Sequence, residues 1–374
     1  MTSGDYRHLQ REGLDALVEL LARRGFTVIG PTVRDGAIVL DEISSAAELP
    51  IGWTDEQDAG TYRLRRRDDE ACFGHVVGPD SLKRFLLPPT LTVFSARRGP
   101  DGKITMERPE CEPRRMAFIG VRSCDLHAMG ILNGVLHSGA APSVSPDETL
   151  IISVQCGEAG GTCFCTSMGT GPRAESGFDL ALTEVVEDGE HWFAVEVGTP
   201  AGAELLAELP ARPATAQESQ EAALRPEQAA TQMGRTMETG DLRDLLMGNL
   251  EHPRWEEVAS RCLSCGNCTM ACPTCFCVEI ADTSDATGAE AEREQRWASC
   301  FTVDHAYLNG GSVRPTTQSR YRQWMTHKLS TWWDQFGTSG CVGCGRCITW
   351  CPVGIDITEE VAAIRASDTR GDAS

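Results

Sequence analysis

The pattern of hydrophobic and polar positions in the first 40 residues predicts one helix followed by a strand hairpin. In residues 8–24 leucines recur at near-helical spacing, and Gly25 stands where a C-terminal cap belongs. Two short apolar runs, 27–30 and 37–40, flank an Arg-Asp-Gly turn. We therefore expect an amphipathic first helix and an antiparallel pair of strands.

Two apolar runs of buried-strand length, 116–121 and 150–155, predict strands of an α/β sheet. Each run ends in a cysteine-bearing loop, with Cys124 after the first run and Cys156 after the second. A helix over residues 126–137 between the runs completes a βα unit. Because ligands of α/β sheets gather beyond the carboxyl ends of the strands, these two loops form a candidate site.

The remaining pattern predicts two domains and a linker. Residues 181–198 alternate around an Asp-Gly turn and predict a second hairpin. The chain then becomes rich in Ala, Glu, Gln and Pro, which favours a helical linker. We expect an α/β domain over residues 1–205, a linker over 206–240, and a mainly α-helical, ferredoxin-like domain over 241–374. Within this last domain, residues 324–336 predict an amphipathic helix.

Composition and charge narrow the class of protein. A chain of 374 residues with 41% hydrophobic content is long enough for two domains. The net charge of −20 argues against a nucleic-acid partner, because phosphates attract a basic surface. No run approaches the roughly 20 apolar residues of a membrane span, and no signal-like leader opens the chain. We expect a cytoplasmic protein with no membrane partner. Lysine is scarce and occurs only at Lys83, Lys103 and Lys328.

Eight cysteines near the C-terminus form two copies of the pattern C-x2-C-x2-C-x3-C-P. This spacing is typical of [4Fe-4S] binding, because a tight loop aims three sulfurs at three corners of one small cube. The fourth cysteine of each copy usually binds the other cluster. The pattern therefore predicts two [4Fe-4S] clusters, one held by Cys262, Cys265, Cys268 and Cys351 and the other by Cys341, Cys344, Cys347 and Cys272.

Structural zinc or disulfide bonds are the alternative uses of these eight cysteines. Zinc sites prefer two ligand pairs separated by a longer loop, whereas here four cysteines are crowded together before a proline. Disulfide frameworks belong to short secreted chains. Both alternatives fit the spacing less well than clusters do.

Four further cysteines lie after the two predicted strands and predict a third metal site. Cys156, Cys163 and Cys165 occur within ten residues, among glycines that let the backbone approach a bulky group. With Cys124 they supply enough thiolates for a third [4Fe-4S] cluster, and Asp125 is a substitute oxygen ligand if Cys124 points elsewhere. The alternative is a set of buried free thiols that pack as small hydrophobic residues.

Cys275, Cys277 and Cys300 occupy the long insertion between the two cysteine runs, and their role stays open between spare ligands, redox-active thiols and packing. The sequence contains no G-x-G-x-x-G after a strand and no G-x-x-x-x-G-K-[ST]. The usual phosphate-binding loop motifs of nucleotide-binding proteins are therefore absent. We assign no catalytic residue and expect a chain that conducts electrons.

Several segments resemble the iron–sulfur beta subunit of cytoplasmic bidirectional nickel–iron hydrogenases, which are also called sulfhydrogenases. The similarity spans most of residues 116–374 and is diffuse before residue 110. The chain is also similar to the A component of anaerobic sulfite reductase. The segments that carry the resemblance are GVRSCDLHAMGIL (120–132), CGEAGGTCFCTSMGTGP (156–172), CPTCFC (272–277), SCFTVDHAYLNGGSVR (299–314), SRYRQWMTHKL (319–329) and GCVGCGRCITWCPVGIDIT (340–358).

The resemblance implies a non-catalytic electron-transfer subunit of a multi-subunit, NAD(P)-linked nickel–iron hydrogenase. The implied partners are a subunit that binds FAD and NAD(P), and the small and large hydrogenase subunits. The eight C-terminal cysteines carry over as cluster ligands, whereas the N-terminal ligand set is our own inference. Two alternatives stay open: an electron-transfer subunit of an anaerobic sulfite or polysulfide reductase, and an assembly subunit whose clusters only hold the fold together.

Overall fold

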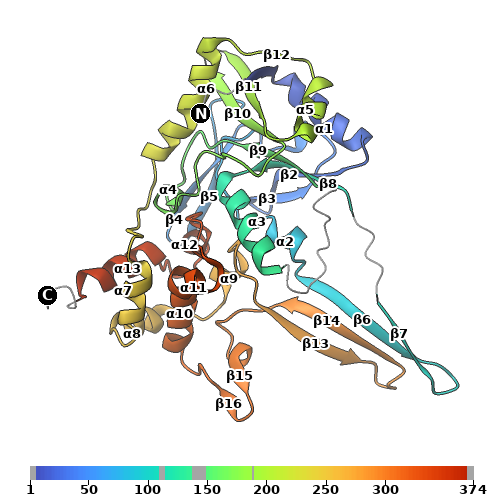
Figure 1. Cartoon of the computed structure of the whole chain (residues 1–374), viewed down its shortest axis with the longest axis vertical. Helices are drawn as coiled ribbons and strands as arrows, with labels where there is room; N and C mark the ends of the chain where they lie inside the picture. Colours follow the sequence, from blue (N-terminus) through green and yellow to red (C-terminus); the bar gives the residue numbers. More distant parts are fainter. Residues whose placement is uncertain (1–5, 109–113, 137–148, 188, 369–374) are drawn as a thin grey trace.

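The computed structural model describes residues 6–108, 114–136, 149–187 and 189–368. Figure 1 shows a large sheet, a group of short helices and a long strand arm that extends away from both. The strands are β1 Arg7–Gln10, β2 Thr27–Arg34, β3 Ala37–Glu42, β4 Trp53–Asp58, β5 Thr61–Arg66, β6 Thr90–Arg98, β7 Ile104–Glu107, β8 Met116–Val121, β9 Thr149–Val154, β10 Leu180–Glu187, β11 Glu190–Val197, β12 Ala211–Pro213, β13 Val278–Ser284, β14 Glu290–Trp297, β15 Tyr307–Leu308 and β16 Gly311–Ser312. The α-helices are α1 Glu12–Arg23, α2 Lys83–Leu86, α3 Ser123–Leu136, α4 Cys165–Met168, α5 Pro200–Ala207, α6 Ala216–Thr231, α7 Leu242–Gly248, α8 Arg254–Arg261, α9 Asn267–Met270, α10 Thr317–Thr326, α11 Trp332–Phe336, α12 Arg346–Thr349 and α13 Ile357–Ala366.

The large sheet has the strand order β12-β1-β11-β10-β9-β8-β2-β3 among the described residues. Its central strands β10, β9, β8 and β2 are parallel, and the strands at both flanks pair antiparallel. Both predicted hairpins and both predicted buried strands are confirmed, although the turn residue 188 lies outside the described residues. The sheet brings the carboxyl ends of β8 and β9 side by side, as the βα prediction requires.

Helix α1 forms where the leucine spacing predicts it, although residues 8–10 of the expected helix belong to strand β1 instead. The buried side chains of Leu14, Leu17, Val18 and Leu21 join the apolar core that contains strands of the large sheet. Full burial of a side chain of this size contributes roughly 1.5–3 kcal/mol, so these contacts fix the N-terminal part of the fold.

Helix α3 begins three residues earlier than predicted, and the last predicted residue, 137, lies outside the described residues. Cys124 and Asp125 therefore lie in the first turn of the helix, where a loop was expected. Just before it, Gly120 has a φ of +83°, and the register of β8 against β9 shifts between Ile119 and Val121. This bulge bends the end of β8 immediately ahead of the candidate site.

The arm is a four-stranded antiparallel sheet with the order β13-β14-β6-β7 (Figure 1). Strands β6 and β7 come from the predicted N-terminal domain, whereas β13 and β14 come from the insertion between the two cysteine runs. The C-terminal part therefore contains strands as well as short helices, so the prediction that this domain is mainly helical is not confirmed. The pairing of β6 with β14 also joins the two predicted domains through a shared sheet.

The predicted linker contains regular structure that packs on the large sheet. Strand β12 pairs with β1, and Thr215 begins α6 with a capping box to Glu218. The helix predicted over 324–336 is observed as the end of α10, a π-helical turn over His327–Thr331, and α11. No described helix combines the length and apolar character that crossing a bilayer requires.

Candidate metal centres

The first predicted cysteine set, which we name site A, surrounds a common cavity. Its walls include Phe301, Tyr321, Trp324 and Ile355, which are all buried. Cys262 and Cys265 lie before α9, Cys268 lies in α9, and Cys351 follows α12, so two distant segments of the chain contribute cysteines to one cavity. The cysteines of site A are Cys262, Cys265, Cys268 and Cys351.

The two cysteine runs fold into loops with the same backbone. In the first loop Ser264 has a φ of +52° and its N–H donates to Cys262 Sγ at 3.4 Å. In the second loop Gly343 has a φ of +64° and its N–H donates to Cys341 Sγ at 3.5 Å. Backbone N–H groups aimed at sulfur favour an anionic thiolate, which is the form that binds metal. The donor geometry of both loops therefore fits an iron–sulfur cluster.

The second predicted set, site B, lies beside site A, because its member Cys347 also lines the site A cavity. Lys328 is 2% exposed, and its Nζ donates to Cys272 Sγ at 3.2 Å, to Thr274 Oγ1 at 3.1 Å and to the carbonyl of Gly340 at 2.9 Å. A buried ammonium thus contacts a predicted ligand directly. The cysteines of site B are Cys272, Cys341, Cys344 and Cys347.

The third predicted set, site C, is brought together where β8 and β9 end. Cys124 lies in the first turn of α3, Cys156 follows β9, and Cys165 begins α4. The thiols of Cys156 and Cys163 lie within electrostatic range of Cys165, as does that of Cys344 of site B. Cys124 packs in one apolar cluster with Cys165 and Cys344. The cysteines of site C are Cys124, Cys156, Cys163 and Cys165.

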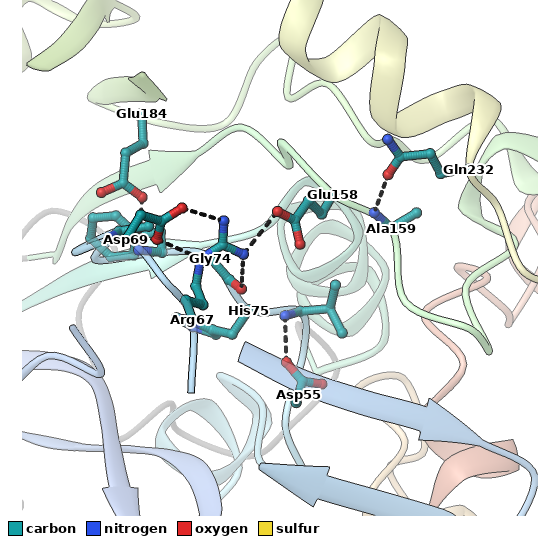
Figure 2. Close-up of polar contacts among 12 residues, drawn as sticks. Asp55, Arg67, Asp69, Gly74, His75, Glu158, Ala159, Glu184 and Gln232 are labelled. Atoms are coloured by element: carbon teal, nitrogen blue, oxygen red, sulfur yellow. Dashed lines mark hydrogen bonds and ion pairs between the residues drawn. The ribbon is translucent and has the colours of Figure 1, made fainter. Parts of the chain in front are cut away.

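Polar contacts hold the loop between β9 and α4 from two sides, as Figure 2 shows. On one side Arg67 Nη1 donates to Glu158 Oε1 at 2.8 Å and to the carbonyl of Gly74 at 3.2 Å. On the other side the Ala159 N–H donates to Gln232 Oε1 at 3.4 Å. These contacts restrict the loop that carries Cys156 and Cys163 of site C, which is what a preorganised ligand set requires.

Sites B and C are in direct backbone contact. The Phe164 N–H donates to the carbonyl of Gly343 at 2.9 Å, and Thr170 Oγ1 donates to the carbonyl of Val342 at 2.6 Å. A Cβ at Gly343 would lie 2.7 Å from the Cα of Cys165, so this approach depends on glycine. The loop of the second cysteine run is therefore packed against the loop of site C.

Buried cations lie beside the sulfurs of site C. Arg122 is 3% exposed, donates to the carbonyls of Phe73 and His75 at 2.8 and 2.7 Å, and also hydrogen-bonds the Cys156 sulfur. Burial raises the pKa of Cys163 to about 12, so the thiol holds its proton at neutral pH until a metal displaces it. A buried arginine in this position favours an anionic occupant.

Asp125 does not face the solvent or stand free for a metal, because its carboxylate pairs with Arg346. The Arg346 Nη2 lies 3.0 Å from Asp125 Oδ2 and the Nη1 lies 2.9 Å from Oδ1. Both side chains are buried, at 6% and 2% exposure. Arg346 stands between Cys344 and Cys347 in the second run, so the pair joins α3 to site B.

The structure also places the three unassigned cysteines near site B. Cys275 hydrogen-bonds the Cys272 sulfur, and that contact lowers the pKa of Cys272, with a further contribution from Lys328. Cys277 and Cys300 hydrogen-bond each other. A separate group, Cys72 with Glu184 and His191, lies in the N-terminal part, where Glu184 accepts the backbone N–H groups of residues 72 and 73 and supports that loop.

These cations were missed from the sequence because each contacts residues that are distant along the chain. Lys328 lies 56 residues from Cys272, and Lys83 donates to the carbonyls of Thr269 and Met270. One signal was available. Lysine occurs only three times, and two of the three lie within cysteine-rich parts of the fold.

These features define the class of protein: two cysteine loops with matching positive-φ residues and matching N–H···S contacts are those of a dicluster iron–sulfur protein. In agreement, residues 261–355 match the family described as 4Fe-4S dicluster domain. The chain is 30% identical over 349 residues to subunit beta of sulfhydrogenase 2 from Pyrococcus furiosus, which covers 90% of this chain and 92% of that protein. The chain therefore belongs to the family of sulfhydrogenase beta subunits, as the sequence motifs indicated.

Proposed function

We propose that this chain is the electron-transfer subunit of an NAD(P)-linked nickel–iron hydrogenase, relaying electrons between a flavin- and NAD(P)-binding subunit and the hydrogenase small subunit. Membership of the sulfhydrogenase beta family supports a place in such a complex. The observation that carries the proposal is the continuity of the cysteine sets. Cys347 of site B lines the site A cavity, and Cys344 of site B packs with Cys124 and Cys165 of site C.

In this proposal each site holds one [4Fe-4S] cluster, so the chain binds three. Sites A and B supply the crosswise ligand sets, and site C supplies Cys124, Cys156, Cys163 and Cys165. Because Asp125 is engaged by Arg346, we assign Cys124 and not Asp125 as the ligand from α3. When bound, such clusters accept and pass on single electrons without making or breaking other bonds.

The chain's own residues would set the environment of these clusters. Tyr321, Trp324 and Phe301 form an apolar wall that excludes water from site A. Lys328 at site B and Arg122 at site C place positive charge next to ligand sulfurs. Positive charge beside a cluster favours its reduced form, because reduction adds negative charge.

Site A is the set nearest the solvent, and we infer that a partner subunit docks there. Cys265 is exposed, and the rim beside it carries Leu263 and Val353, which are 63% and 36% exposed. An apolar rim around an exposed ligand suits a contact that must bring another redox centre close. Electrons would enter or leave the chain through this face.

The experiment that tests the relay replaces Cys344 by Ala in the intact complex. Cys344 belongs to site B, which contacts both other sites through Cys344 and Cys347, so we expect loss of one cluster and a halt in hydrogen-driven NAD(P) reduction. The nickel–iron site lies on another subunit, so exchange of hydrogen isotopes should continue. Iron content and both activities are measured on anaerobically purified complex.

A matched control is Cys72→Ala, which removes a buried thiol outside the three sites. This variant should retain iron content and coupled turnover. Normal NAD(P)-coupled turnover in the Cys344→Ala complex, with one cluster missing, would show that electrons do not pass through this chain.

A further inference from the structure

Two thiols that belong to none of the three cluster sites meet at the base of the strand arm. Cys277 directly precedes β13 and Cys300 follows β14. The register of the hairpin pairs Val278 with Trp297, and the Ala298 N–H donates to the carbonyl of Cys277 at 2.9 Å. The closing end of the hairpin thus brings the two cysteines together from positions 23 residues apart in the chain.

The two side chains are in direct contact. The Cys277 sulfur accepts hydrogen bonds from the Cys300 thiol and from the Cys300 backbone N–H. Both residues are half-buried, so the pair lies at the surface of the fold and not deep in its core. Two sulfurs in hydrogen-bond contact, one a donor and the other an acceptor, form the arrangement from which a disulfide is made.

The surroundings favour a thiolate at Cys277. The hydrogen bond from Cys300 lowers the pKa of Cys277 to about 6, and the charges of His305 and Lys328 act in the same direction. The same contact raises the pKa of Cys300, which stays protonated. A thiolate beside a protonated thiol is the reactive form of a dithiol pair.

The pair lies beside both C-terminal cluster sites. Phe301, the residue after Cys300, lines the site A cavity, and Cys300 packs against the same apolar core as the site A cysteines. Lys328, which lies within electrostatic range of both thiols, donates to Cys272 of site B. Electrons can therefore pass between this pair and a cluster without a long path.

We propose that Cys277 and Cys300 form a redox-active dithiol that exchanges two electrons with the clusters of sites A and B, an inference that rests on the proposed function. In the oxidised state a Cys277–Cys300 disulfide is present. Two single-electron transfers from reduced clusters and two protons from solvent break the S–S bond and give two thiols. In reverse, the thiols lose two protons and two electrons to oxidised clusters as the bond forms.

The experiment measures whether Cys277 and Cys300 form a disulfide or two thiols in the purified holoprotein at a series of fixed potentials. Each sample is quenched in acid, then unfolded in urea and alkylated with iodoacetamide at mildly alkaline pH, where thiols are ionised, and peptides containing Cys277 and Cys300 are quantified by mass spectrometry. Cluster cysteines are released on unfolding and alkylate at every potential, so only a disulfide remains protected. We expect both cysteines to be protected together at high potential and alkylated together at low potential.

Two variants separate the possible outcomes. Cys300→Ser should abolish protection at Cys277 while iron per chain and the cluster EPR signals stay at wild-type levels. Cys72→Ser is the matched control and should leave protection unchanged.

Alkylation of both cysteines at every potential, in protein with full iron content, would overturn the dithiol while leaving the relay intact. A loss of about four irons per chain in Cys300→Ser would instead identify Cys300 as a cluster ligand and overturn the inference. Low iron in the unaltered protein would be a failure of the proposed function itself.

Discussion

Replacing Lys328 by Met should lower the reduction potential of the cluster that we assign to site B. The Lys328 ammonium is 2% exposed and donates to Cys272 Sγ at 3.2 Å. Reduction adds one negative charge to the cluster, and the ammonium stabilises that charge. Met occupies a similar volume without the charge, so the reduced form loses this stabilisation.

The magnitude follows from Coulomb's law. We take the added electron as spread over the cluster, at an effective distance of roughly 6 Å from Nζ, about twice the Nζ–Sγ distance. With an effective dielectric constant of about 20, the interaction is about 3 kcal/mol. A tenfold change in equilibrium corresponds to about 59 mV for one electron, so the shift is roughly 120 mV. Water that enters beside Met reduces the shift, and we expect a fall of roughly 100 mV.

The assay is an EPR-monitored potentiometric titration of anaerobic protein, with iron measured in each sample. Lys328→Gln keeps a hydrogen-bond donor and removes the charge, so it should show a fall of similar size. Lys103→Met removes an exposed lysine on the arm and is the matched control, with no shift expected. A change below ~20 mV in both Lys328 variants, at full iron content, would show that the Lys328 charge does not set this cluster's potential.

Two further predictions test site C and its link to site B. Cys163→Ala should remove about four irons and leave the two C-terminal clusters in place, whereas unchanged iron content would show that these cysteines are not ligands. Asp125→Asn should lower the free energy of unfolding by roughly 3–5 kcal/mol, because Arg346 is left buried and unpaired. Denaturant unfolding of the anaerobic holoprotein measures this change. The iron content of this variant should stay the same, and a loss of iron would restore Asp125 as a ligand.

Local patterns in the sequence predicted the parts of the structure that depend on local geometry. The C-x2-C-x2-C-x3-C spacing specifies a tight loop, and the observed φ values at Ser264 and Gly343 are those of such loops. Apolar runs of strand length predicted β8 and β9, and their parallel pairing brings Cys124 and Cys156 to one edge of the sheet. The candidate ligands could therefore be identified from the amino-acid sequence alone.

The features that sequence reasoning missed depend on contacts between distant segments. The pairing of β6 with β14 joins strands about 200 residues apart, and polar, exposed strands of this kind carry little hydrophobic signal. Asp125 and Arg346 lie 221 residues apart, so nothing in either local pattern shows that the carboxylate is already paired. Because Asp125 forms an ion pair with Arg346, the structure removes Asp125 from the candidate ligand set.

Counting iron and acid-labile sulfide per chain determines whether one chain holds three clusters that pass electrons in series. The measurement uses anaerobically purified protein and is combined with EPR during a reductive titration. We expect about twelve irons, about twelve sulfides and three reducible clusters whose signals interact. About eight irons with two clusters would contradict a third cluster at site C. The electron-transfer path within the chain would then be confined to residues 262–351.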